Sequence, residues 1–193
     1  MANQEEVRDV YGYFEKKGTA LCYRYEAERL IIEPWGKNSL RVRASKMAEM
    51  PQEDWALIPP EEKSEPVIEV FEDGGTITNG KIKAEINLIG KLTFYNQKGE
   101  VLLEEYLRDR RDMFGSTCSS LEVEAREFKP IIGGDYKLSM RFVSEPKEKL
   151  YGMGQYQQPY LDVKGADLEL AHRNSQASVP FMLSSLGYGF LWN

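Results

Sequence analysis

Apolar and polar residues alternate with a period of two along most of this 193-residue chain. The clearest run covers residues 81–88, in which Ile82, Ala84, Ile86 and Leu88 are separated by charged or amide side chains. Successive side chains of a β-strand point to opposite faces, so this pattern gives a strand one apolar and one polar face. Such strands bury their apolar faces when one antiparallel sheet packs against another.

Further runs repeat the alternation, and turns rich in glycine or asparagine separate them. The runs cover residues 21–25, 40–45, 121–126 and 136–142. Glycine adopts the positive φ that a tight hairpin turn requires, and such turns are indicated at residues 73–75, 79–80, 96–99 and 133–135. Many short strands joined by close turns predict an all-β fold, an antiparallel β-sandwich with little helix.

Two segments depart from this pattern. Val7, Val10, Tyr11 and Phe14 recur at helical spacing, which favours a short amphipathic helix, although a first strand opening at residues 11–14 fits equally well. The span Met50 to Pro66 is rich in proline, which removes a donor from a strand ladder. It is therefore predicted to be a connecting loop within one domain.

The charge of the chain limits the partners it can bind. The net charge is −6, which argues against a nucleic-acid partner because phosphate binding depends on lysine and arginine releasing counterions. The one basic cluster, formed by Arg108, Arg110 and Arg111, is interleaved with aspartates. We expect this cluster to form a solvated face.

The sequence also bears on compartment and redox state. Its first residues are acidic where a secretory signal would be basic and then apolar, and no segment approaches the roughly 20 apolar residues of a membrane span. A cytoplasmic protein with no membrane partner is therefore expected.

Cys22 and Cys118 lack metal-ligand spacing and are expected to be free, partly buried thiols, with a disulfide as the open alternative.

The stretch from Lys149 to Asn193 concentrates groups that suit a sugar ligand. Amides and guanidiniums form hydrogen bonds with hydroxyls, and aromatic faces pack against the C–H sides of a sugar ring. The Gly152-Met153-Gly154 run lacks the third glycine of a dinucleotide fingerprint, so no cofactor and no metal are predicted. The polar groups in question are Gln155, Gln157, Gln158, Arg173 and Asn174.

Several motifs carry a resemblance to a known family. They are Tyr-Gly-Met-Gly-Gln at 151–155, His-Arg-Asn-Ser-Gln at 172–176, Val-Pro-Phe at 179–181, the run 185–193 and, upstream, the run 32–44. In order and spacing they resemble the N-terminal domain of glycoside hydrolase family 31, the α-glucosidase and α-xylosidase group. The resemblance implies a galactose-mutarotase-like supersandwich placed ahead of a catalytic (β/α)8 barrel.

The resemblance also implies what the chain does and does not contain. A (β/α)8 barrel of about 250 residues cannot fit in this length. Residues 1–193 are therefore expected to form a single N-terminal domain of a longer retaining enzyme that hydrolyses α-linked glucosides or xylosides. Both catalytic carboxylates of the family lie on barrel loops, so no catalytic residue is assigned here, and this chain is expected to be inactive alone.

A smaller role is implied for one loop. In the family, a loop of the N-terminal sandwich presents an Arg-Asp or similar pair to the sugar, and Arg173 and Asn174 match it here. Asparagine in place of aspartate keeps the acceptor, adds a donor and removes the charge, which leaves the sugar preference open. His172 is the third substrate-binding candidate, with an ordinary structural histidine as the alternative.

Aromatic and apolar residues of the same stretch have two interpretations. A sugar-stacking platform is one, and core filling or domain docking is the favoured one; the residues are Tyr151, Tyr156, Tyr160, Tyr188 and Trp192. A docking face of Phe181, Leu183, Phe190 and Trp192 is expected to be partly bare and to cause self-association.

Two other functions compete with the family 31 interpretation. The first is a free-standing carbohydrate-binding module. The second is an aldose mutarotase, which shares the fold but needs a general acid and a general base around the sugar, usually a histidine with a glutamate. The chain has a single histidine, His172, which makes the mutarotase the weaker alternative.

Overall fold

The computed structural model describes residues 12–52, 54, 56–62, 64–112, 115 and 118–193. The chain divides into two compact units, unit 1 up to Val143 and unit 2 from Ser144 to Asn193, and each is described by itself. The described residues contain strands and no helix, so none of them forms a helix long and apolar enough to span a membrane. The prediction of a single domain over residues 1–193 stays a prediction.

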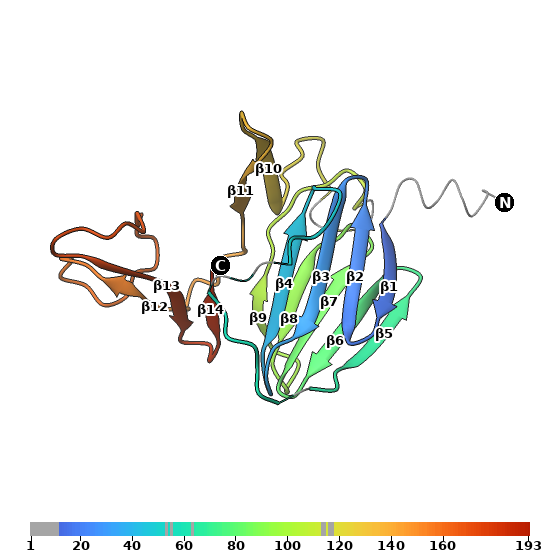
Figure 1. The fold of residues 1–193 in the computed structure, drawn as a ribbon, viewed down its shortest axis with the longest axis horizontal. Helices are drawn as coiled ribbons and strands as arrows, with labels where there is room; N and C mark the ends of the chain where they lie inside the picture. Colours follow the sequence, from blue (N-terminus) through green and yellow to red (C-terminus); the bar gives the residue numbers. More distant parts are fainter. Residues whose placement is uncertain (1–11, 53, 55, 63, 113–114, 116–117) are drawn as a thin grey trace. The chain divides into compact units, whose positions relative to one another are not determined.

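Unit 1 is built on two antiparallel sheets that lie face to face (Figure 1). The first has the order β1-β2-β3-β4, with bounds Tyr13–Lys17, Ala20–Tyr25, Glu28–Pro34 and Leu40–Ser45. The second has the order β5-β6-β7-β8-β9, with bounds Val67–Phe71, Gly74–Asn79, Ile82–Asn87, Leu92–Tyr95 and Val101–Glu104. The predicted all-β antiparallel sandwich is confirmed.

The core between the sheets comes from the alternation seen in the sequence. Leu21 and Tyr23 from β2 and Ala84 and Ile86 from β7 are buried in one cluster, while their neighbours along each strand face outward. Gly75 on β6 lies beneath this cluster, because a Cβ there would stand 3.0 Å from a methyl of Leu21. Glycine at this position leaves room for the Leu21 side chain of the opposite sheet.

The side chain of Asn79 joins the two sheets at one end of the sandwich. It is buried at the end of β6, and its amide donates hydrogen bonds to the carbonyls of Gly36 and Ser39, both 2.8 Å away in the β3–β4 turn. The sequence predicted a turn at Asn79-Gly80, and the turn is present with Gly80 at a φ of 59°. The second role of Asn79, as a link between the sheets, was not predicted.

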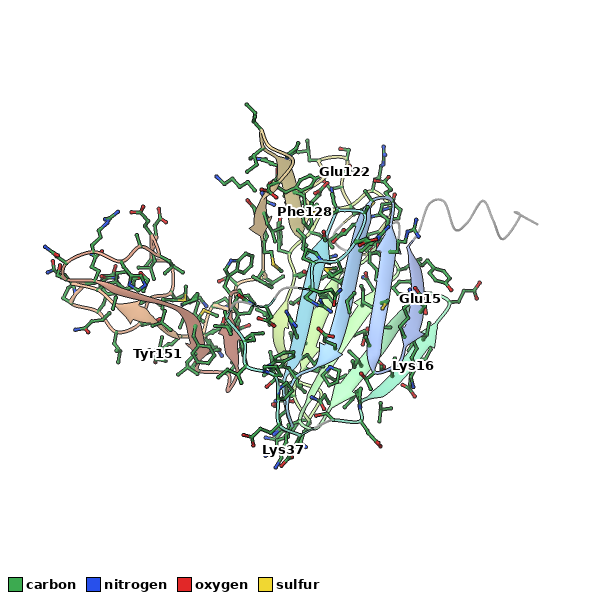
Figure 2. All side chains as sticks on the ribbon, in the orientation of Figure 1. Glu15, Lys16, Lys37, Glu122, Phe128 and Tyr151 are labelled. Atoms are coloured by element: carbon green, nitrogen blue, oxygen red, sulfur yellow. The ribbon has the colours of Figure 1, made fainter. Side chains whose placement is uncertain are left out.

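A two-stranded hairpin, β10 (Arg126–Pro130) and β11 (Tyr136–Met140), completes unit 1. Phe128, labelled in Figure 2, packs edge to face on Tyr136 within it. The predicted strand at residues 121–126 is wrong. Among the described residues, Val123 forms an isolated bridge with Arg108, Leu121 is exposed, and Arg126 alone of this run belongs to a strand.

A buried ionic cluster ties this hairpin to the sandwich. Arg126 pairs with Glu105 and with Glu28, at 2.6 Å in the second case, and donates to the carbonyl oxygen of Gly90 at 2.8 Å. Glu105 is fully buried, and one of its carboxylate oxygens accepts from the amide of Leu92. Burial raises the pKa of Glu105, which the charge of Arg126 opposes.

Two expectations about exposure are wrong in unit 1. Arg111 was expected on a solvated face, but its guanidinium forms a fork with Asp109 and stacks 4.1 Å from the ring centre of Tyr25. Both cysteines are free as expected, yet Cys118 is exposed, while Cys22 is partly buried and burial raises its thiol pKa. Stacking on an aromatic ring lets a guanidinium leave water without losing electrostatic stabilisation.

The first residues of the chain test the helix prediction only in part. Val7, Val10 and Tyr11 lie outside the described residues. Phe14 belongs to strand β1, which begins at Tyr13, and it packs in the core against Tyr23. The described part therefore agrees with the alternative of an opening strand.

Unit 2 contains one antiparallel sheet with the order β12-β13-β14, bounded by Leu150–Gln155, Ala177–Ser184 and Gly189–Leu191. Its pairing shifts between Gly152 and Gly154, and the three residues 152–154 all have positive φ. A Cβ at Gly154 would stand 2.1 Å from the carbonyl oxygen of Ala177, so glycine is required by the backbone there. The Gly152-Met153-Gly154 run, which was considered as a dinucleotide-binding motif and set aside, therefore forms a β-bulge in this sheet.

The register of this sheet divides the expected docking face. Phe181 pairs with Leu191 and Met182 pairs with Phe190, so Phe181 and Phe190 point to opposite faces. Tyr151, labelled in Figure 2, shares the face of Leu183, its partner on β13. Phe190 packs against Trp192 on the other side. The four predicted residues therefore do not form one face; both faces of the sheet carry apolar side chains.

Candidate functional site

The candidate site of unit 2 is an open hollow of about 410 Å³. The residues around it lie between the end of β12 at Gln155 and the start of β13 at Ala177, so one long connection supplies the hollow. This volume falls in the range of small-molecule sites. The lining residues are Tyr156, Gln157, Gln158, Tyr160, Asp167, Leu168, Glu169, Arg173 and Gln176.

The base of this connection is held by Asp162. Its carboxylate accepts hydrogen bonds from the amides of Leu150 and Lys164, at 3.0 and 3.1 Å. These two N–H groups stabilise the charged carboxylate and lower the pKa of Asp162. The amide of Val163 also donates to the carbonyl of Leu150, at 2.8 Å. The connection is thereby anchored on β12 before it reaches the hollow.

A tight hairpin turn carries the family-matched residues. Arg173 and Gln176 bridge each other through two backbone hydrogen bonds of 3.2 and 3.0 Å, which leaves Asn174 and Ser175 at the tip. Neither tip residue is among those with positive φ. The turn is therefore neither type I′ nor type II′, the two types whose twist matches that of a hairpin.

Hydrogen bonds from Ser178 lie beside this turn. The Ser178 hydroxyl donates to the carbonyl of Ala171 at 3.1 Å and lies 3.0 Å from the hydroxyl of Tyr156. The Ser178 amide donates to Nδ1 of His172 at 3.4 Å. Ser178 thus links His172, which precedes the turn, to Tyr156, which lines the hollow.

An exposed ion pair forms part of the wall. Arg173 pairs with Glu169, and both side chains remain more than half exposed. Exposed pairs contribute about 0–1 kcal/mol, so little energy prevents the guanidinium from binding a ligand instead. Together with the glutamine amides and Tyr156 and Tyr160, the wall offers donors, acceptors and aromatic faces.

The predicted substrate-binding residues are placed differently by the structure. Arg173 lines the hollow, whereas His172 and Asn174 belong to the same turn without lining it. All three are exposed. Their contact with a substrate stays a prediction.

The predicted aromatic platform is divided. Tyr156 and Tyr160 line the hollow. Tyr188 instead donates to the buried carboxylate of Glu148 at 2.8 Å, and Tyr151 and Trp192 lie along the sheet. Only the first two tyrosines are placed to stack on a ligand in the hollow.

Sequence reasoning missed two acidic residues of the site. Neither Asp167 nor Glu169 was predicted as a site residue, yet both line the hollow. The spacing of four residues between Glu169 and Arg173 could have indicated that the two side chains form an ion pair. Both carboxylates are exposed. They therefore lack the enclosed surroundings in which a glycosidase gives its two catalytic carboxyl groups different pKa values.

No metal centre is formed by the side chains that the structure describes. Among these residues, no group of three or more histidine, cysteine, aspartate or glutamate side chains is arranged to hold an ion.

The fold and the hairpin turn agree with one family. Residues 29–193 match the family described as the glycosyl hydrolase 31 N-terminal galactose mutarotase-like domain. The chain belongs to this family. The resemblance found in the motifs at 151–155 and 172–176 is thereby confirmed.

Known relatives are larger glycoside hydrolases. An uncharacterised family 31 glucosidase of Pseudescherichia vulneris is 53% identical over 90% of this chain and 34% of its own length. The α-xylosidase A of Aspergillus niger is 26% identical over 94% of this chain and 26% of its own. The chain thus spans about a third or less of the length of these relatives.

Solved structures show the same architecture. A family 31 α-xylosidase from a soil metagenome, solved with xylose, superposes with a TM-score of 0.89 at 52% identity, over 93% of this chain and 28% of the other. A dextranase of Flavobacterium johnsoniae, 16% identical with a TM-score of 0.65, shares the fold alone.

Proposed function

We propose that this chain is the non-catalytic N-terminal part of a retaining α-glycosidase that acts on α-xylosides in preference to α-glucosides. In this role, the turn at residues 172–176 contacts the sugar beside a catalytic barrel supplied by the rest of the enzyme. Arg173 and Asn174 bind sugar hydroxyls, and His172 adds a third polar group.

One observation carries this proposal. Arg173, which matches the sugar-binding arginine of the family loop, lines a hollow of about 410 Å³ together with amides and tyrosines. Its partner Glu169 is exposed and weakly held, so the guanidinium is available to a ligand. Preference for xylosides is supported by the α-xylosidase that is 52% identical and was solved with xylose.

The test uses the full-length enzyme that contains this chain, assayed on aryl α-xyloside and aryl α-glucoside. Arg173→Ala is expected to raise KM about ten-fold on the xyloside, since a hydrogen bond to a charged group contributes about 1.5–3 kcal/mol. Lys98→Ala, an exposed residue in a turn of unit 1, is the control. An unchanged KM in Arg173→Ala would contradict the proposal, as would hydrolysis by the 193-residue chain alone.

The carbohydrate-binding module remains the second candidate, because the hollow is formed entirely by this chain. Calorimetry of the 193-residue chain with xylo- and gluco-oligosaccharides separates the two. A module binds at micromolar to millimolar concentration. A domain that only completes the cleft of a larger enzyme releases no heat.

The remaining parts of the proposal concern location and assembly. A cytoplasmic location of the enzyme stays a prediction. The 193-residue chain is expected to self-associate through the exposed side chains Phe181 and Leu183, which share one face of the sheet. Sedimentation velocity of the chain and of Leu183→Lys measures this, and a monomer at all concentrations would contradict it.

A further inference from the structure

The turn at residues 172–176 needs support that its backbone does not provide. With negative φ at Asn174 and Ser175, it lacks the twist that keeps hairpin strands together. The backbone pairing of Arg173 with Gln176 is an isolated bridge. The next contacts along the hairpin are made by the side chains of Ser178 and His172.

We propose that Ser178 is a positioning residue for this turn, and that it sets the hydrogen-bonding polarity of two groups toward a sugar. This inference rests on the proposed function, since it assumes that the turn faces a glycoside. It assigns a role to Ser178, which the sequence did not indicate, and a hydrogen-bonding role to Tyr156, which the sequence indicated only as a candidate for sugar stacking.

The polarity follows from counting hydrogens. A serine hydroxyl has one hydrogen, and that of Ser178 is donated to the carbonyl of Ala171. The 3.0 Å contact with Tyr156 must then use the tyrosine hydrogen, with Ser178 as the acceptor. The phenol oxygen of Tyr156 keeps its lone pairs, so at the hollow it accepts a hydrogen bond from a sugar hydroxyl.

The same reasoning applies to His172. Its Nδ1 accepts the amide hydrogen of Ser178, so the neutral ring carries its own hydrogen on Nε2. His172 therefore acts as a donor to a sugar oxygen. Ser178 thus sets one acceptor on Tyr156 and one donor on His172, a pairing that suits a ligand whose hydroxyls are both donors and acceptors.

The first experiment measures the turn itself, in the 193-residue chain, by amide hydrogen exchange followed by NMR. Ser178→Ala is expected to speed exchange at the Gln176 amide about ten-fold, the effect of losing about one hydrogen bond. Ser178→Thr keeps the hydroxyl and is expected to match the wild type. Tyr156→Phe, which removes one contact and leaves the fold intact, is expected to give an intermediate rate.

Ser175→Ala is the matched control for this measurement, since Ser175 lies exposed at the tip of the same turn and is not part of the Ser178 network. It should exchange like the wild type. Exchange in Ser178→Ala within two-fold of the wild type would overturn the inference. A Ser178→Thr variant that behaves like Ser178→Ala would do the same.

The second experiment measures the sugar in the full-length enzyme. Ser178→Ala is expected to raise KM for the aryl α-xyloside about five-fold with kcat changed less than two-fold, and Ser178→Thr to restore it. If Arg173→Ala raises KM and Ser178→Ala does not, the positioning role is overturned. If neither variant changes KM, the proposed function itself fails, and with it the sugar-facing role of the turn.

Discussion

The two units of this chain stabilise their strands by different means. Every buried apolar side chain among the described residues belongs to unit 1, from Phe14 to Ala125. The buried residues of unit 2 are polar, Glu148 and Ser184, joined by a 2.5 Å hydrogen bond. Unit 2 instead exposes apolar side chains such as Leu183, which is 50% exposed.

This difference teaches which part of the chain can fold on its own contacts. Unit 1 buries the inner faces of two sheets against each other, which is the main favourable contribution to folding. Unit 2 has one three-stranded sheet with apolar residues on both faces, and such sheets occur where both faces are covered. We therefore expect unit 2 to be the less stable part in isolation.

The largest expected effect is on the ionic cluster of unit 1. Arg126→Met leaves the buried carboxylate of Glu105 without its cation and should lower the free energy of unfolding by about 3–5 kcal/mol. Urea denaturation measures this. Arg110→Met, at an exposed ion pair, should change stability by less than about 0.5 kcal/mol. Equal losses of unfolding free energy in both variants would show that Arg126 does not stabilise the buried carboxylate of Glu105.

The next effect compares the two units directly. Leu21 is fully buried, and Leu21→Ala should cost about 3 kcal/mol through lost burial and the cavity left behind. Leu183→Ala should cost less than about 0.5 kcal/mol, because the side chain is already half in water. Thermal unfolding of both variants checks the difference. Similar costs at the two sites would break the distinction between the units.

A pH series sharpens the comparison at Glu105. Burial raises its pKa above the ordinary value of 4.5, so the folded protein holds this proton more tightly than the unfolded chain. Its contribution favours folding below the ordinary pKa and is lost as the pH rises through the folded pKa. The stability of the wild type relative to Glu105→Gln should therefore fall as the pH rises above the ordinary value of 4.5.

Urea unfolding at each pH gives this relative stability. Glu122→Gln, which removes an exposed carboxylate of the same unit, is the control variant. A relative stability of the wild type that rises with pH would mean that the pairing of Glu105 with Arg126 outweighs its burial.

The smallest effect concerns backbone strain, which each unit stores at one non-glycine residue among those that the structure describes. Glu26 has a φ of 51° in an exposed turn of unit 1, and Met153 has a φ of 66° in the bulge of unit 2. Glu26→Gly should stabilise by about 0.5 kcal/mol, the relief of left-handed strain less the added freedom of the unfolded chain. Met153→Gly should change little, because it also loses a half-buried side chain. Differential scanning calorimetry measures both, and destabilisation in Glu26→Gly would contradict the account.

Much of the fold was predictable from the sequence, for local reasons. The strands around Leu21, Val42, Ile86 and Leu138 follow the alternation, and the hairpin turns follow their glycines. The failure at residues 121–126 shows the limit. An alternating run becomes a strand only where a neighbouring strand supplies continuous hydrogen-bond partners, and Val123 pairs with Arg108 in an isolated bridge.

The candidate site was predictable only in outline. The motif at 172–176 indicated the turn and Arg173, but Asp167, Glu169 and the hydrogen bonds of Ser178 became visible only in three dimensions. The docking face failed for a related reason. Residues Phe181 and Phe190 are close in the sequence, but their faces depend on the register between β13 and β14.

The amino-acid sequence by itself determined most strands and turns of unit 1 and the family of this protein, since these depend on residues near each other along the chain. The tertiary structure decided which charges are buried and which side chains share a surface. Arg126 meets Glu28 across 98 positions and Glu105 across 21, and no local pattern records such a meeting. The physical reason is that burial and hydrogen-bond partnership depend on distances in space, which side-chain periodicity does not specify.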